Sequence, residues 1–116
     1  MPHNYFASQA RADRLIRKFG RRVTLNAGAT ITEAFGVEVE FTPQERRTLV
    51  NPVSRLFLLT PVGLGVVPDQ HKHILVTYRV PATDPATMEE RLKIDAPPGR
   101  FAPGGIVIYW ELQVSA

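Results

Sequence analysis

The N-terminal part of the chain carries apolar side chains at a helical spacing. They recur every three or four positions on one face, with Tyr5 on the same side: Ala12, Leu15, Ile16 and Phe19. Asn4 or Ser8 is a suitable N-cap, and Gly20 is expected to end the helix in the left-handed conformation that glycine adopts at low cost. We therefore predict one amphipathic helix over residues 5–20, with its apolar stripe packed on the rest of the domain.

After the helix the period changes to two, which is typical of β-strands with one buried face. The alternating apolar sets occupy residues 23–25, 37–41, 74–80, 92–94 and 106–114. In the second set Val37 and Val39 are expected to face the core, and Glu38 the solvent. Residues 56–60 are apolar at nearly every position, which predicts a strand covered on both faces.

Ten prolines and eight glycines cluster between these sets, where the missing N–H of proline breaks no ladder. The pattern predicts a mainly β fold, a small β-barrel or sandwich of about six to seven strands with one N-terminal α-helix. We expect a single domain over residues 1–116, with the β part over residues 22–114. Segments 27–36 and 81–90 are small, polar or proline-rich, and we predict that they are mobile loops.

Composition narrows the function classes. The chain of 116 residues has no cysteine, which excludes disulfides, thiolate catalysis and cysteine-based zinc sites. No stretch has the apolar length of a signal peptide or a membrane span. We therefore expect a protein made in the cytoplasm, with no membrane partner.

The net charge of +3 is unevenly distributed. Residues 1–22 carry six basic side chains and one acidic one, whereas the remainder carries eight basic and ten acidic ones. The basic residues of the first segment are the candidate partner- or DNA-binding residues: Arg11, Arg14, Arg17, Lys18, Arg21 and Arg22. Four of them, Arg14, Arg17, Lys18 and Arg21, are predicted to lie in a row opposite the apolar stripe. This row favours an acidic protein or a phosphate backbone as partner, although cations near a helix C-terminus are also favoured by the helix dipole.

Two histidines invite a test for a metal site. His71 and His73 would point the same way on a strand, but a site needs a third ligand such as Asp69 or His3. No spacing in the sequence specifies that ligand, so we favour an exposed turn that leads into a strand and predict no metal.

The remaining candidate groups do not assemble into catalytic chemistry. Paired glutamates at 38/40 and 89/90 are interpreted as solvated strand faces, with an acidic lining for a DNA channel as the less favoured use. The serines at 8, 54 and 115 lie in no nucleophile elbow, and the Gly-Leu-Gly segment at 63–65 lacks the third glycine of a dinucleotide site. We predict no catalytic residue, no cofactor and no small-molecule substrate.

Three segments resemble the small head–tail joining proteins of tailed bacteriophages, also called head-completion, neck or stopper proteins. They are RADRLIRKFGRRVTL (11–25), RLFLLTPVGLGVVPDQ (55–70) and RLKIDAPPGRFAPGGIVIYWELQV (91–114). Such proteins typically join a helix to a Val-Thr-Leu strand through a Phe-Gly-Arg step, and close with a Pro-Gly-Gly turn and a strand that ends near Glu-Leu-Gln. Segment 27–36 lacks the Asp-Pro-x-Thr-Gly hairpin common in that family, and segment 81–90 resembles an insertion.

The resemblance implies a non-enzymatic virion protein in the neck of a phage or phage-like particle, made in the cytoplasm of the bacterial host. It implies a homo-oligomeric ring that joins the portal or its adaptor to the tail and helps to retain DNA, with packaged double-stranded DNA as a further candidate contact. The alternatives are a tail terminator or minor tail protein, a small nucleic-acid-binding domain, and a metal-dependent hydrolase that uses His71 and His73.

Overall fold

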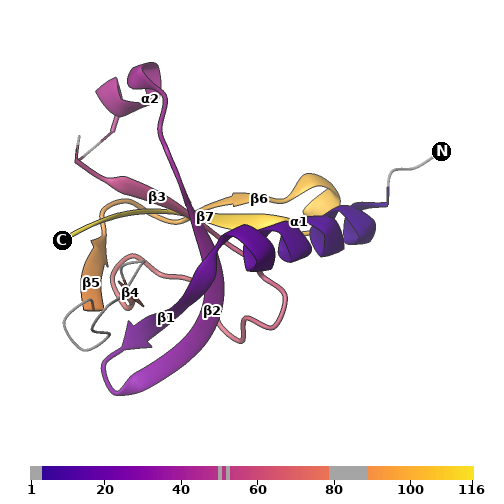
Figure 1. The fold of residues 1–116 in the computed structure, drawn as a ribbon, viewed down its shortest axis with the longest axis horizontal. Helices are drawn as coiled ribbons and strands as arrows, with labels where there is room; N and C mark the ends of the chain where they lie inside the picture. Colours follow the sequence, from indigo (N-terminus) through magenta and orange to yellow (C-terminus); the bar gives the residue numbers. More distant parts are fainter. Residues whose placement is uncertain (1–3, 50, 52, 79–88) are drawn as a thin grey trace.

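An antiparallel sheet closes into a barrel beside an N-terminal helix in the computed structural model, which describes residues 4–49, 51, 53–78 and 89–116 (Figure 1). Its helices and strands are α1 (Tyr5–Phe19), β1 (Arg21–Ala27), β2 (Thr30–Val39), α2 (Pro43–Arg47), β3 (Arg55–Leu59), β4 (Ile74–Tyr78), β5 (Glu89–Ile94), β6 (Gly99–Phe101) and β7 (Tyr109–Ser115). A 3-10 turn at Pro103–Gly105 joins β6 to β7.

Six of these strands form the barrel. They follow the order β3–β2–β1–β4–β5–β7, and the pairing of β3 with β7 closes the ring of strands. β6 lies outside the barrel and pairs with β7. The prediction of a mainly β fold with one N-terminal helix is therefore confirmed, and of the two architectures expected, the closed barrel is the one found.

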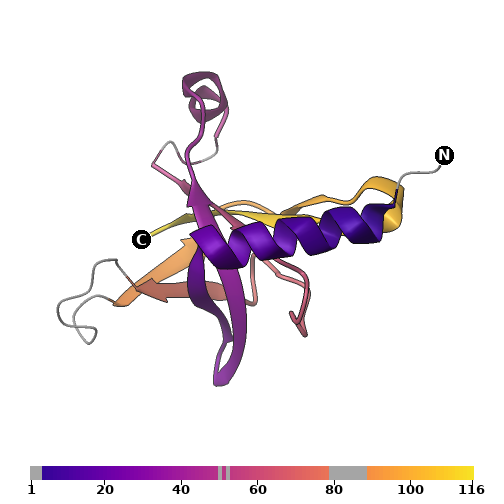
Figure 2. The same ribbon diagram turned by 45° about the vertical axis from the view of Figure 1, so that its right-hand side comes forward.

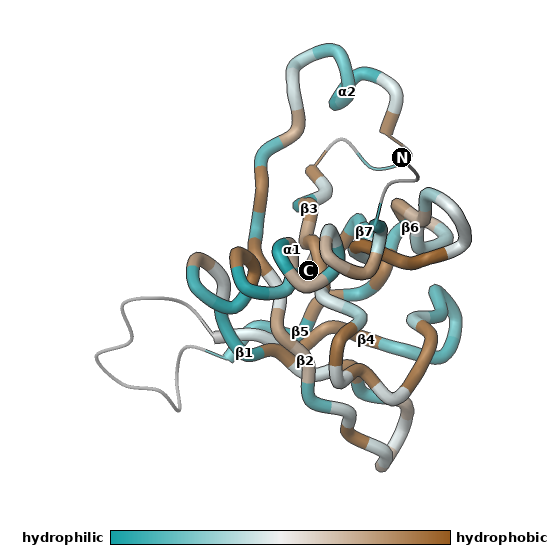
Figure 3. Tube along the Cα trace, turned by 90° about the vertical axis from the view of Figure 1, so that its right-hand side faces the viewer, coloured by the Kyte–Doolittle hydropathy of each residue, from teal (hydrophilic) through white to brown (hydrophobic). Residues whose placement is uncertain are grey.

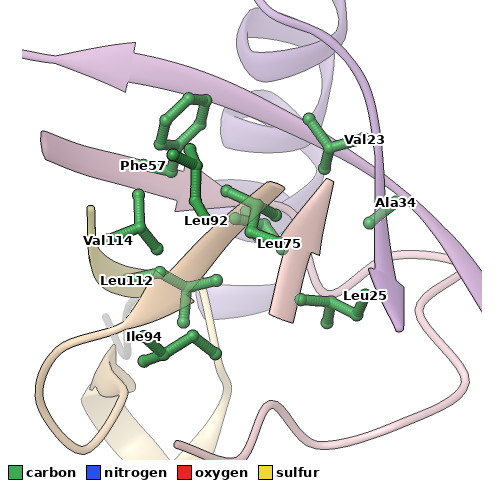
Figure 4. Close-up of a cluster of buried hydrophobic side chains, with 10 residues drawn as sticks. Val23, Leu25, Ala34, Phe57, Leu75, Leu92, Ile94, Leu112 and Val114 are labelled. Carbon is green, nitrogen blue, oxygen red and sulfur yellow. The ribbon is translucent and has the colours of Figure 1, made fainter. Parts of the chain in front are cut away.

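The barrel interior is filled by the inward-facing residues of the six strands (Figure 4). Phe57, Leu59, Leu25, Leu75 and Leu112 have no exposed surface at all. Each such side chain contributes about 1.5–3 kcal/mol through the removal of its apolar surface from water. This interior, and not α1, holds the main hydrophobic core.

The predicted helix is confirmed, but its C-terminus has another geometry. Asn4 caps the start, because its side-chain oxygen accepts a hydrogen bond from the backbone N–H of Ala7 at 3.1 Å. Gly20 has φ of −97°, so the expectation of a left-handed residue is wrong. A Cβ at Gly20 would collide with the carbonyl oxygens of Gly36 and Ile16. Glycine is needed there because the end of α1 packs directly against β2.

The prediction that residues 27–36 form a loop is wrong. β1 and β2 form one continuous hairpin, with a turn at Gly28 (φ +61°) and Ala29. The small residues of this segment belong to strand positions: Ala34 and Gly36 face the crowded interior, where a Cβ on Gly36 would touch Leu59. Residues 81–88 of the second predicted loop lie outside the described residues, and its last two residues already belong to β5.

A short helix between β2 and β3 was missed. α2 begins with a capping box, in which Thr42 and Glu45 exchange side-chain and backbone hydrogen bonds of 3.2 and 2.8 Å. The Thr-Pro-Gln-Glu sequence at 42–45 carries the signal for it. α2 is hydrophilic and projects away from the barrel (Figure 3). None of the helices in the described residues combines the length and apolar surface needed to cross a lipid bilayer.

Candidate interaction surface

α1 lies along the outside of the barrel and runs beside β7 and the β6–β7 connection (Figure 2). Polar contacts set its rotation about its own axis. Asp13 accepts hydrogen bonds from Thr60 and from Arg17, both at 2.7 Å, and Arg17 donates to the carbonyl oxygen of Val62 at 3.1 Å. Near the other end, Gln9 donates to the carbonyl oxygen of Val107 at 2.8 Å. The helix face that meets the barrel is therefore partly polar.

This rotation leaves half of the apolar stripe uncovered. Ile16 is buried, but Leu15 is 51% exposed and Phe19 is 68% exposed. The prediction that the whole stripe packs on the barrel is therefore wrong. The cause is the hydrogen-bonded anchor of Asp13 and Arg17, which turns the stripe toward the edge of the contact.

The exposed edge of the stripe forms one wall of an apolar groove of about 280 Å³, which we call the α1 groove. It is lined by Ala12, Leu15, Ile16, Phe19, Val37, Leu58 and Tyr109. Burial raises the pKa of the Tyr109 hydroxyl, and the charge of Glu111 acts in the same direction, so Tyr109 stays neutral at physiological pH. The groove therefore suits an apolar group, because its lining has no charged side chain that would fix a polar ligand.

The outer side of β3 also lacks the cover that its sequence predicts. Phe57 and Leu59 face the interior and are fully buried, whereas Leu56 and Leu58 face outward and are only half-buried. The expectation of a strand covered on both sides is thus met on one side only within the described residues. Leu58 is one of the residues that line the α1 groove.

The six predicted basic residues do not form one row. Arg11, Arg14 and Lys18 are exposed on α1. Arg17 is exposed as well, but it pairs with Asp13 and lies 4.4 Å from the centre of the Phe35 ring. Of the four cations expected in one outward row, Arg14 and Lys18 are exposed on α1 without an ion pair to any described residue, whereas Arg17 is paired with Asp13 and Arg21 belongs to β1.

The other two basic residues belong to β1. Arg22 lies over the outward-facing Phe35 ring, 5.5 Å from its centre, and remains exposed. Arg21 has the same strand parity as Val23 and Leu25, so it faces the barrel interior. The side chains of Arg21 and Arg22 thus lie on opposite faces of the sheet. Of the two, only Arg22 adds to the exposed positive charge near α1.

Arg21 belongs to a group of ionic and polar side chains at one mouth of the barrel, which we call the mouth cluster: Arg21, Glu38, Arg55, Thr77 and Glu90. Each continues the inward-facing row of its own strand beyond the apolar core. Arg55 binds both carboxylate oxygens of Glu38 at 2.8 Å and reaches Glu90 at 2.9 Å. Arg21 lies 3.5 Å from Glu38 and donates to Thr77 at 2.8 Å.

The mouth cluster corrects the predicted orientation of β2. Ala34 and Gly36 are buried on the inner face, so Glu38 faces inward while Val37 and Val39 face outward. The hydrogen bond from Arg55 holds the pKa of the Glu38 carboxyl below its usual value, and the charge of Arg21 acts in the same direction. Glu38 is therefore exposed, as the alternation indicated, but it lies at the mouth of the barrel and pairs with Arg55 instead of lying on the outer face of the sheet.

The two histidines lie in a turn before β4. His73 is nearly buried, and its Nδ1 accepts a hydrogen bond from the backbone N–H of Asp69 at 3.1 Å. Asp69 in turn accepts from the backbone N–H groups of His71 at 2.8 Å and Lys72 at 3.1 Å. His3 lies outside the described residues, and no three potential metal ligands gather in the part of the chain that is described.

Two of the serines are buried in a structural contact. Ser54 and Ser115 donate their hydroxyls to the two oxygens of Asp95 at 2.5 and 2.9 Å. Asn51 donates to Ser115 at 3.1 Å. The three hydrogen bonds tie the start of β3 to the ends of β5 and β7, which is a stabilising role.

The chain matches no protein-family model, no curated protein and no solved structure. A functional assignment therefore depends on the sequence motifs and on the surfaces described above. Of these surfaces, the sequence indicated the exposed cations of α1, whereas the α1 groove and the mouth cluster depend on contacts between distant residues.

Proposed function

We propose that this protein is a structural subunit of a tailed bacteriophage or phage-like particle, a head–tail connector or stopper. It forms a ring in the virion neck, joins the portal or its adaptor to the tail and helps to retain the packaged DNA. It acts through binding surfaces and performs no catalysis.

The resemblance to head–tail joining proteins supports this proposal. Its three segments occupy connected parts of the fold: α1 with β1, β3 with the loop that follows it, and β5 to β7. The Phe-Gly-Arg step is the point where α1 packs against β2, and the Pro-Gly-Gly step forms the turn in which Gly104 and Gly105 have positive φ. In both motifs glycine thus stands at a position where a larger residue would collide with the backbone or would have to adopt a positive φ.

The observation that carries the proposal is the open α1 groove. Leu15 and Phe19 remain more than half exposed beside the half-buried outer face of β3. Contiguous apolar surface of this kind, bordered by charged residues, is typical of a protein–protein contact. Arg11, Arg14 and Lys18 border the helix side and favour an acidic surface or phosphates.

The experiment is a deletion of the coding sequence from the phage or prophage genome that carries it. We expect filled heads and separate tails by negative-stain electron microscopy, with joined particles restored when the intact gene is supplied in trans. Infectious, joined particles made without this protein would refute the proposal.

The alternatives predict other results. A tail terminator would leave tails of abnormal length in the same deletion. A nucleic-acid-binding domain would show tight, salt-sensitive binding of duplex DNA by the isolated subunit. We expect only weak DNA binding, because the chain beyond residue 22 has more acidic than basic residues.

A further inference from the structure

The shape and chemistry of the α1 groove limit what can occupy it. Its volume of about 280 Å³ lies below the roughly 300–1,000 Å³ of pockets that bind small molecules, and its lining is apolar. Such a groove fits one or two apolar side chains that a protein surface presents. Leu15 and Phe19 would lose their exposed surface in that contact.

The helix side of the groove is cationic. Arg11 and Lys18 lie four residues before and three residues after Leu15, so all three are neighbours on the helix surface. Arg11 makes no ion pair or side-chain hydrogen bond with any residue that the structure describes. Among the same residues Lys18 makes no ion pair either, and its ammonium lies 5.3 Å from the centre of the Phe19 ring. A complementary partner therefore presents an apolar side chain next to a carboxylate.

The tip of the β1–β2 hairpin has that combination. Ile31 is 63% exposed, and Glu33 is exposed two positions further along the same outer face of β2. The Glu33 side chain has no ion pair or hydrogen bond within the described part of the chain. By contrast, the exposed Val53 lies beyond the basic end of α2, and the carboxylate of Asp69, near the exposed Val67, is engaged in its turn.

The hairpin tip cannot fill the groove of its own subunit. Ile31 and the groove residue Val37 lie on the same outer row of β2, six positions apart, which is about 20 Å along an extended strand. The hairpin extends away from α1 (Figure 1). Only another molecule can bring the two surfaces together.

We propose that the α1 groove binds the β1–β2 hairpin tip of a second copy of this chain. Ile31 of one copy packs between Leu15 and Phe19 of the next, and Glu33 pairs with Lys18 or Arg11. Because the two surfaces differ, each copy can bind one neighbour with its groove and another with its tip. Such head-to-tail contacts generate a closed ring when the rotation between copies closes. The inference thus supplies a contact for the proposed neck ring and rests on that proposal for its biological setting.

Disulfide trapping tests the contact directly, because the chain has no cysteine of its own. Two single variants, Ile31→Cys and Leu15→Cys, are purified, mixed and oxidised. We expect a covalent heterodimer in the mixture and much less dimer in either variant alone. The matched control replaces the first variant with Val53→Cys, at an apolar residue that is slightly more exposed than Ile31 (72% against 63%). Equal cross-linking by Val53→Cys, or no cross-link with Ile31→Cys, would overturn the contact.

Charge reversal tests the electrostatic half of the contact. Glu33→Lys should lower the yield of the Ile31–Leu15 cross-link about fivefold, and Arg11→Glu with Lys18→Glu in the partner should restore it. Glu40→Lys, at an exposed glutamate just beyond the far end of β2, is the matched control and should have no effect. A Glu33→Lys variant that cross-links as well as the parent would overturn the assigned pairing.

The two proposals fail separately. A neck defect in the deletion strain without the Ile31–Leu15 cross-link leaves the neck function standing and removes this contact. A specific Ile31–Leu15 cross-link together with normal particles in the deletion strain confirms the contact between copies and removes the proposed neck function.

Discussion

The two faces of the barrel wall formed by β2, β3 and β7 differ in how completely they are covered. On the inner face, Phe57, Leu59 and Leu112 are fully buried. On the outer face, the neighbouring residues Leu56 and Leu58 are only half-buried, although their sequence is just as apolar. The fold of one subunit therefore accounts for the apolar residues of the inner face only. The outer residues are those that the proposed contact with a second copy would cover, and the difference can be tested residue by residue.

The largest effect is expected from Phe57→Ala. It removes a fully buried ring from the barrel interior, so the free energy of unfolding should fall by about 3–5 kcal/mol. Leu58→Ala, one position along the same strand, should cost about 1 kcal/mol or less, because the residue already contacts water. Chemical denaturation of both variants measures the contrast. Equal losses would show that the outer face is as important for folding as the inner one.

A smaller effect is expected at the mouth cluster. Arg55→Gln removes one ion-pair partner from each of Glu38 and Glu90, while Arg21 stays 3.5 Å from Glu38. We expect a loss of about 1–2 kcal/mol in the free energy of unfolding, less than for a buried pair because water reaches all three groups. Arg100→Gln, at an exposed arginine on β6, is the control. A loss no larger than that of the control would show that the cluster is merely a surface feature.

The mouth cluster also predicts a dependence on pH. Because the pKa of Glu38 is lowered in the folded state, its pairing with Arg55 stabilises the fold above the unfolded-state pKa of about 4.5. This stabilisation is lost as the pH falls through the lowered pKa, while Arg55 stays charged. Thermal unfolding between pH 6 and pH 3 should therefore show a steeper drop for the parent than for Glu38→Gln. Parallel curves would contradict the assignment.

The smallest effect on stability is expected at the outer face of α1. Leu15→Asp should change the free energy of unfolding by no more than about 0.5–1 kcal/mol, because the side chain is half exposed. Its effect should fall on self-association, measured by sedimentation velocity on concentrated protein. Ile16→Asp, the buried neighbour, should unfold the helix contact and serves as the comparison. Unfolding of both variants would place Leu15 in the core.

Hydrophobic periodicity was enough to predict the helix, most strands and the fold class. It did not determine which face of β2 is inside, because both faces carry small or apolar residues and a period of two is symmetric. Ala34 and Gly36 are inside because the interior is crowded there, and Glu38 follows them inward to meet Arg55 from another strand. That partner is 17 residues away in the sequence, beyond the reach of a local pattern.

The candidate groove could not be predicted for the same reason. The apolar stripe of α1 is correct as a pattern, but its rotation is set by the hydrogen bond from Thr60 to Asp13, which spans 47 residues. Sequence alone thus identified the cations Arg11, Arg14 and Lys18 as candidates. It did not show that Leu15 beside them stays exposed.

The pairing of β3 with β7 has a consequence for biosynthesis. These strands lie far apart in the chain, with Leu59 opposite Trp110, so the barrel cannot close until β7 has been translated. Until then β3 and β5 each have an unpaired edge, and such edges readily pair with strands of other nascent chains. Pairing between strands this far apart in the sequence is also slow to form. The segment between them loses conformational entropy before the hydrogen bonds of the pairing are made. Newly made chains are therefore expected to be most prone to aggregation in the interval before the last strand docks.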